Sequence, residues 1–121
     1  MSEDLRKRTK QFALRVIRYT AKLPNSVEAD VLGRQLLKAG TSPGAHYREA
    51  CRSRSDAEFI SKVEVALQEL DESQYWTELL VESGIGAVDA GQEIWQEADE
   101  LIAIFVTSVK KTKSRRSDVA K

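Results

Sequence analysis

The segment from Gly40 to Ala45, Gly-Thr-Ser-Pro-Gly-Ala, constrains the fold of this chain more than any other. It lies between two apolar segments with helical spacing. Gly40 and Gly44 are four residues apart, so in a helix they share one face and leave a notch without side chains. Each glycine costs a helix about 1 kcal/mol relative to alanine, so the notch predicts that a second helix packs closely there. The alternative is an ordinary loop between two helices.

Pro43 bears on the choice between these two structures. Its missing N–H removes a hydrogen bond to Ala39, and Ser42-Pro43 has the form of a cap followed by a first helical position. Local rules alone therefore favour a break at Pro43 over one long helix that is kinked there.

Amphipathic spacing predicts helices on both sides of the first proline. From Leu5 to Leu23, apolar positions recur at steps of four and three, as in a helix that faces a bundle partner. These positions are Leu5, Thr9, Phe12, Val16, Tyr19 and Leu23. The helix should end before Pro24, and Asn25 or Ser26 should cap the next one. The apolar positions expected there are Val27, Val31, Leu32, Leu36, Ala39, Ala45, Tyr47 and Ala50.

Two further helices follow. Ser55 and Glu58 form a capping box, and the core face expected after it is Phe59, Ile60, Val63, Ala66, Leu67, Leu70 and Val81. Gly84 and Gly86 should end that helix. A fourth helix should start at Asp89 and bury Ile94, Ala98, Leu101, Ile102, Phe105 and Val109. We therefore predict an all-α, antiparallel up-down four-helix bundle over residues 1–113, followed by a basic flexible tail over residues 114–121.

Length and composition exclude several classes of protein. The chain has 121 residues, which is one domain, and its single cysteine excludes an internal disulfide and any multi-cysteine metal site. The polar N-terminus lacks the apolar core of a signal peptide. The longest apolar run, residues 101–106, is too short to cross a bilayer. We expect a cytoplasmic protein that does not contact membranes.

The zero net charge of the chain hides three charged segments. Residues 1–54 carry a net charge of +7, residues 55–109 carry −12, and residues 110–121 carry +5. The basic and acidic segments are either separate solvated faces or complementary surfaces that meet within a subunit or between neighbouring subunits. Arginine and lysine in the basic half suit phosphate binding. The candidate nucleic-acid-binding residues are Lys10, Arg15, Arg18, Arg48, Arg52 and Arg54.

The third helix carries apolar residues on two faces. Val65, Trp76 and Leu79 lie nearly opposite the expected core face, interleaved with Glu69 and Glu72. A helix in an isolated bundle needs one apolar stripe, so this second face predicts contact with another subunit. The alternative is that Trp76 lies flat on its own helix.

No constellation in the sequence indicates catalysis or a cofactor. Di-metal bundles use a Glu-x-x-His motif on each of two helices, whereas the only histidine here, His46, precedes Glu49 in reverse order. His46 and Cys51 are five residues apart, so on a helix they point about 140° away from each other. We expect a protein that is not an enzyme and has no metal or cofactor, with His46 as a hydrogen-bonded residue beside the notch.

The chain resembles a known family in several ordered motifs. Gln35-Leu-Leu, Gly40-Thr-Ser, Gly44-Ala45, Glu49-Ala50, Phe59-Ile60, Lys62, Glu69, Glu72 and Tyr75-Trp76 resemble the four-helix-bundle proteins encoded in 23S ribosomal RNA intervening sequences. The resemblance covers about residues 12–86. Accessory proteins of diversity-generating retroelements are more distant relatives of the same family.

The resemblance implies three properties. It implies an antiparallel bundle that assembles as a homo-oligomer, typically a homopentamer. It implies that the small-residue segment lies within one continuous helix. The residues that we expect in close helix packing there are Gly40, Ser42, Gly44, Ala45 and His46. An aliphatic residue is usual at the position of Pro43, and asparagine at that of His46. The retroelement relatives bind nucleic acid and a reverse transcriptase, so RNA, DNA and such an enzyme are the partners that the resemblance implies.

Two functions are consistent with these features. The first is a homo-oligomeric assembly or adaptor protein that binds RNA or DNA, with little sequence specificity, through its basic helices. The second is a pure protein-interaction scaffold, in which arginines near Ser53 pair with Glu69, Glu72 or Glu78 of a neighbouring copy. High salt should weaken nucleic-acid binding in the first case and loosen the oligomer itself in the second.

Overall fold

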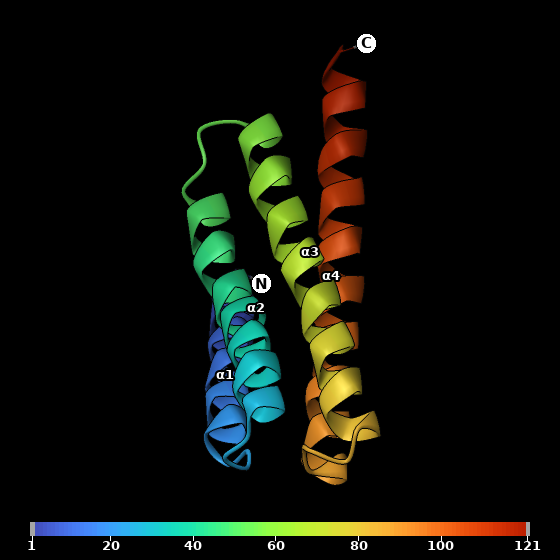
Figure 1. Ribbon diagram of the computed structural model, residues 1–121. Coiled ribbons are helices and arrows are strands. Elements are labelled where there is room, and N and C mark those ends of the chain that lie inside the picture. The colour runs from blue at the N-terminus through green and yellow to red at the C-terminus, as the bar shows by residue number, and fades with distance from the viewer. Residues whose placement is uncertain (1, 121) are drawn as a thin grey trace.

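Four antiparallel helices form the protein in a computed structural model that describes residues 2–120, with the side chains of residues 4–116 (Figure 1). They are α1 (Ser2–Ala21), α2 (Val27–Cys51), α3 (Asp56–Glu82) and α4 (Val88–Ala120). Each helix packs on the next along the chain, and α1 also packs on α4. The described chain contains no strand. The predicted all-α, up-down four-helix bundle is confirmed.

The connections between helices are short, and serine side chains cap the starts of α2 and α3. Ser26 accepts a hydrogen bond from the amide of Ala29 at 3.1 Å, so Ser26 and not Asn25 is the cap of α2. Ser55 caps α3 in the same way, through the amide of Glu58. Gly84 adopts a φ of +80°, which a residue with a side chain rarely adopts, and lets the chain turn after α3.

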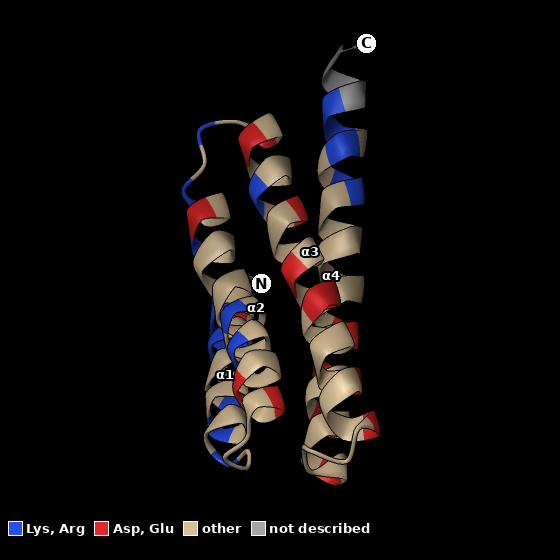
Figure 2. Cartoon of the chain, in the orientation of Figure 1, with Lys and Arg blue, Asp and Glu red and all other residues tan. Residues whose placement is uncertain are grey.

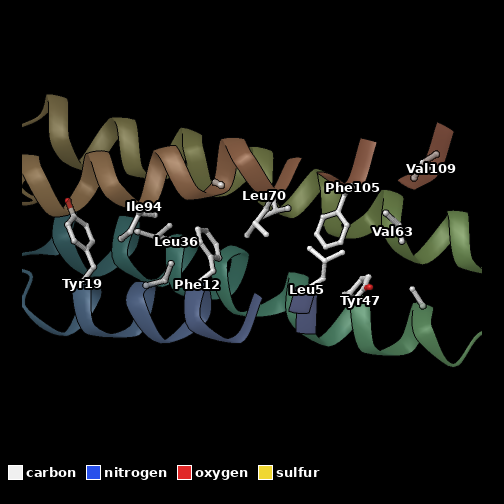
Figure 3. Packing of buried hydrophobic residues seen from close by; sticks show 14 of the residues in the cluster. Leu5, Phe12, Tyr19, Leu36, Tyr47, Val63, Leu70, Ile94, Phe105 and Val109 are labelled. Carbon is white, nitrogen blue, oxygen red and sulfur yellow. The ribbon is translucent and has the colours of Figure 1, made fainter. Parts of the chain in front are cut away.

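One core runs the length of the bundle (Figure 3). The expected seam of α1 is buried from Leu5 to Tyr19, and Leu23 is partly buried beside it. At one end Leu5, Tyr47 and Phe105 lie together, and at the other Tyr19 lies near Ile94. Tyr19 donates a hydrogen bond to the carbonyl of Ala87 at 3.1 Å, which joins α1 to the start of α4.

The second helix runs unbroken through Pro43, which is fully buried. The prediction of one long helix is therefore confirmed, and the break that local rules favour does not occur. Thr41 and Ser42 donate their hydroxyl groups to the carbonyls of Leu37 and Lys38, each at 2.7 Å. Such bonds satisfy the hydroxyls within the helix and often accompany bending.

The buried face of α2 differs from the one expected. Val27 and Val31 are 76% and 52% exposed, and Ala45 is also exposed. Small residues replace them in the interior: Ala29, Gly33, Ala39 and Gly40 are buried with Leu36, Pro43, Tyr47 and Ala50. Close approach of α1 explains the difference, because a larger side chain on that face would meet the α1 side chains.

The core face of α3 also differs from the prediction in its second half. Val81 is only partly buried, while Ser73, Thr77 and Leu80 are fully buried. The two hydroxyls remain inside because Ser73 donates to the carbonyl of Glu69 and Thr77 to that of Ser73, at 2.8 and 2.7 Å. A buried polar group that is hydrogen-bonded avoids most of the desolvation cost.

The last helix extends beyond the boundary expected at residue 113. It includes residues 114–120, where a flexible tail was predicted, and Lys121 lies outside the described residues. Val109 and Thr112 are buried, and Arg115 lies 2.8 Å from Asp56 at the start of α3. These contacts give the end of α4 an attachment that the polar sequence did not indicate.

Candidate nucleic-acid interface

The first and second helices form a groove with a basic rim. Its rim is Arg6 and Lys10 of α1 and Arg48 of α2, and its floor is Thr9, Ala13, Thr41, Gly44 and Ala45. We call it the α1–α2 groove; its volume is about 310 Å³. The floor consists of small residues, and the helices approach closely there: a Cβ at Gly44 would lie 3.3 Å from Oγ1 of Thr9. Three cationic side chains therefore border one groove of small residues.

The six predicted cations share an electrostatic property. Lys10, Arg15, Arg18, Arg48, Arg52 and Arg54 are all exposed, and none forms an ion pair with a residue whose side chain the structure describes. Other cations are paired, such as Arg8 with Glu97 at 2.7 Å and Lys62 with Glu49 at 3.0 Å. The unpaired cations keep their charge available for an external anion.

The structure does not bring all six cations together. Lys10 and Arg48 meet in the α1–α2 groove. Arg15 and Arg18 line another groove with Lys22, where α1 faces the start of α4. Arg52 and Arg54 follow α2 in the connection to α3. Figure 2 shows positive positions mainly on α1, after α2 and at the end of α4, and negative ones mainly on α3 and the first half of α4.

The small-residue segment faces two neighbours. A Cβ on Gly40 would lie 2.7 Å from Cγ2 of Val16, so α1 passes directly over this glycine. Gly44 faces α1 as well, at Thr9. Ser42 and His46 are partly buried, and His46 contacts Glu69 of α3. The segment therefore positions α1 through its glycines and α3 through its histidine.

His46 lies between carboxylates of two helices. Its Nε2 is 3.4 Å from Oε1 of Glu69, and its Nδ1 is 3.8 Å from Oε2 of Glu49, which also pairs with Lys62. Burial raises the pKa of Glu69, and the opposing effects of His46 and Ser42 only partly offset it. Nδ1 of His46 and Oε1 of Glu69 are buried without a well-aligned hydrogen-bond partner, so the contact between the two side chains is mainly electrostatic.

The residues expected at a subunit interface lie along α3 with mixed exposure. Val65 and Glu72 are exposed, while Glu69, Trp76 and Leu79 are partly buried. Trp76 packs against the core of its own bundle, and its ring meets Tyr75 edge-on with centroids 5.1 Å apart. Tyr75 is 53% exposed and more accessible than Trp76. The aromatic residue that projects from this face is thus Tyr75, which the helical pattern did not single out.

Sequence reasoning missed two other surface features. Arg6 completes the rim of the α1–α2 groove, and its position one turn before Lys10 was the available signal. The exposed apolar residues Ile17, Val27 and Leu37 line one groove near the turn between α1 and α2. Val27 had been expected in the core, so only the packing of the helices reveals its exposure.

Three further features of the described chain concern metals, membranes and Cys51. Within the described chain, no group of three or more histidine, cysteine, aspartate or glutamate side chains could hold a metal ion. No described helix is long and apolar enough to cross a membrane. Cys51 borders a groove between α2 and α4, whereas His46 faces α3, so they form no nucleophile and base pair.

Comparisons with known proteins agree with this architecture. A family model described as 23S rRNA-intervening sequence protein matches residues 2–107. A search of curated proteins finds no match. Among solved structures, a protein of unknown function from the S23 ribosomal protein family of Bacteroides thetaiotaomicron VPI-5482 is 31% identical, with a TM-score of 0.83. The match covers 91% of this chain and 99% of that one.

Proposed function

Because the chain belongs to the family of 23S rRNA-intervening sequence proteins, we propose that it is a non-enzymatic, homo-oligomeric adaptor that binds nucleic-acid backbone through α1 and α2. The observation that carries this proposal is the set of six exposed cations without an ion-pair partner among the described side chains. Phosphate oxygens of RNA or DNA are the anions that this arrangement suits.

The distribution of the cations determines the kind of binding. Phosphate contacts position a nucleic acid without reading its sequence, and their free energy comes largely from released counterions. The α1–α2 groove offers Lys10 and Arg48 over a floor of small residues, which lets a phosphate approach closely. No residue that lines the groove is aromatic, so bases cannot stack on aromatic rings there. The expected binding is salt-sensitive and only weakly dependent on sequence.

Homo-oligomerisation would repeat these contacts around a ring. The family resemblance favours a pentamer, and the surface supports contact between unlike faces of two copies. Unpaired cations predominate on α1 and α2, whereas exposed carboxylates such as Asp71, Glu72 and Glu82 lie on α3. Exposed apolar residues accompany both faces, with Ile17 and Leu37 on the first and Tyr75 on the second. Contacts between different faces close into a ring when the rotation permits.

Neutralising the α1–α2 groove should weaken RNA binding selectively. For the double variant Lys10→Gln/Arg48→Gln, we expect the plot of log affinity against log salt concentration to become less steep. The magnitude of its slope should decrease by about 2 for each subunit in contact with the strand. The measurement is a filter-binding titration of structured RNA at several salt concentrations.

The matched control removes two cations that already have carboxylate partners. Arg34→Gln/Lys62→Gln changes the net charge equally, but Arg34 pairs with Asp30 at 3.1 Å and Lys62 with Glu49. Its salt slope should remain close to that of the wild type. Equal losses in the two double variants would show that only net charge matters. Absence of RNA retention by the wild type at low salt would end the proposal.

A pure scaffold is the second candidate, because the same cations could meet carboxylates of another copy. Arg52 and Arg54 would then pair with Glu72 or with Glu78, which here accepts a hydrogen bond from the indole of Trp95 at 2.7 Å. In that case Lys10→Gln/Arg48→Gln leaves RNA retention at background, and high salt lowers the oligomer mass. The salt response of the mass therefore separates the candidates.

A further inference from the structure

An apolar groove lies beside the start of α1, where α2, α3 and α4 extend beyond the first helix (Figure 1). We call it the α2–α4 groove. Leu5, Tyr47, Phe59 and Ile104 supply its apolar surface, and its volume is about 720 Å³. This size falls within the range of small-molecule sites in proteins, roughly 300–1,000 Å³. The groove lies between α2 and α4, next to Leu5 and Arg6 of α1.

The groove carries positive charge and no described negative charge. Arg6 lines it from α1 and Lys111 from α4, and none of its lining residues is aspartate or glutamate. Neither cation forms an ion pair with the side chains of residues 4–116. The Nε of Arg6 is buried without a hydrogen-bond partner. A buried N–H without an acceptor is costly, and the partly exposed Arg6 and the exposed Lys111 carry unpaired positive charge, so the groove is complementary to a negatively charged hydrogen-bond acceptor.

We propose that the α2–α4 groove binds a single-chain alkyl carboxylate, with its carboxylate near Arg6 and Lys111 and its chain along Phe59 and Ile104. The α4 residues that line the groove run from Ala103 to Lys111. That stretch is about 12 Å long at 1.5 Å per helical residue, which suits a medium-length alkyl chain. The site lies apart from Lys10 and Arg48, although Arg6 borders both grooves.

A bound helix fits the groove less well than an alkyl chain does. Two turns of helix span about 11 Å, and so short a segment is not stable alone in water. An extended alkyl chain needs no folded structure and can follow the surface between Tyr47 and Ile104. Burial of its methylene groups removes apolar surface from water and stabilises the complex. The apolar floor and the two cations then act on opposite ends of one small molecule.

Cys51 provides a direct measurement, since it lines the groove and is the only cysteine of the chain. The experiment follows alkylation of the full chain by N-ethylmaleimide, an uncharged reagent, with increasing decanoate below its micelle concentration. Decanoate should slow the reaction at least fivefold at saturation. Decanol, which has the same chain without the charge, should need about tenfold more ligand for half of that protection, because hydrogen bonds to charged groups are stronger.

Two variants test the position of the carboxylate. Arg6→Gln/Lys111→Gln should raise the half-protecting decanoate concentration about tenfold. Thr107→Glu places a carboxylate on an exposed, groove-lining position of α4 and should also abolish protection. This change leaves the core intact, so a folded protein is expected even if the double variant is unstable. Lys10→Gln/Arg48→Gln is the control and should protect Cys51 as the wild type does.

Three results would overturn the proposal. Equal protection by decanol and decanoate would show that no anion is recognised. Unchanged protection in both Arg6→Gln/Lys111→Gln and Thr107→Glu would place the carboxylate elsewhere. Slow alkylation that depends on protein concentration, with no effect of decanoate, would show that a second copy covers the groove. Loss of decanoate protection in Thr107→Glu with intact RNA binding would separate this site from the proposed function, because Thr107 lines the α2–α4 groove and not the α1–α2 groove.

Discussion

Phe105→Ala is expected to lower the free energy of unfolding by about 3–5 kcal/mol, the largest effect among the changes considered. Phe105 is fully buried, and its ring lies 5.3 Å from the ring of Tyr47, centroid to centroid. Truncation removes this contact and leaves a cavity between α2 and α4. Small domains have about 5–15 kcal/mol of stability in total, so the loss would shift the urea midpoint strongly.

Phe59→Ala is the matched control for Phe105→Ala. Phe59 has the same side chain but is only partly buried, at the edge of the core. Its truncation should therefore cost less than half as much in the same urea titration followed by circular dichroism. Equal losses for the two phenylalanines would contradict the location of the core. Alkylation of Cys51 should accelerate in Phe59→Ala, since both residues line the α2–α4 groove.

Gly40→Ala should destabilise the bundle by about 1–3 kcal/mol, although alanine favours helices. The added Cβ would lie 2.7 and 2.9 Å from the two γ carbons of Val16. Val16 is fully buried, so it cannot move aside without disturbing its neighbours. The two helices must therefore separate locally. Urea unfolding of the variant measures the cost.

Gly44→Ala provides the comparison within the same helix. Its Cβ would lie 3.3 Å from Oγ1 of Thr9, a contact that a small shift relieves. Here the gain in helix propensity of about 1 kcal/mol should offset the contact, so the stability should change little. Val16→Ala in the Gly40→Ala background should recover part of the loss, which a double-mutant cycle detects. A neutral Gly40→Ala would contradict the close approach of α1.

The helices and much of the core could be predicted because apolar residues recur at the helical period. In α1 and α4 the large residues of the pattern are also the buried ones, such as Phe12 and Phe105. In α2 this relation fails, since Ala29 and Gly33 are buried while Val27 is exposed. A hydropathy pattern predicts that large apolar residues are buried, whereas close packing of two helices requires small residues at the contact. Which residues of α2 are buried therefore depends on the position of the neighbouring helix.

The candidate sites depend on packing to a greater degree than the helices do. Exposure of Lys10 and Arg48 follows from their positions on polar faces, but their meeting in one groove requires the alignment of α1 with α2. Arg6 and Lys111 are distant in sequence, and only the packing of α1 beside α4 brings them to the same groove. Thr77 is a core position that a hydropathy pattern does not identify, because its polar hydroxyl is satisfied by donating a hydrogen bond to the carbonyl of Ser73 in the preceding turn.

The assembly of several copies is the central claim of this account, and molar mass measured by light scattering tests it most directly. The chain has a mass of 13.6 kDa. At micromolar concentration and moderate salt, we predict a mass about five times larger, unchanged by salt if the unpaired cations serve nucleic acid. A mass of one chain under these conditions would contradict the account.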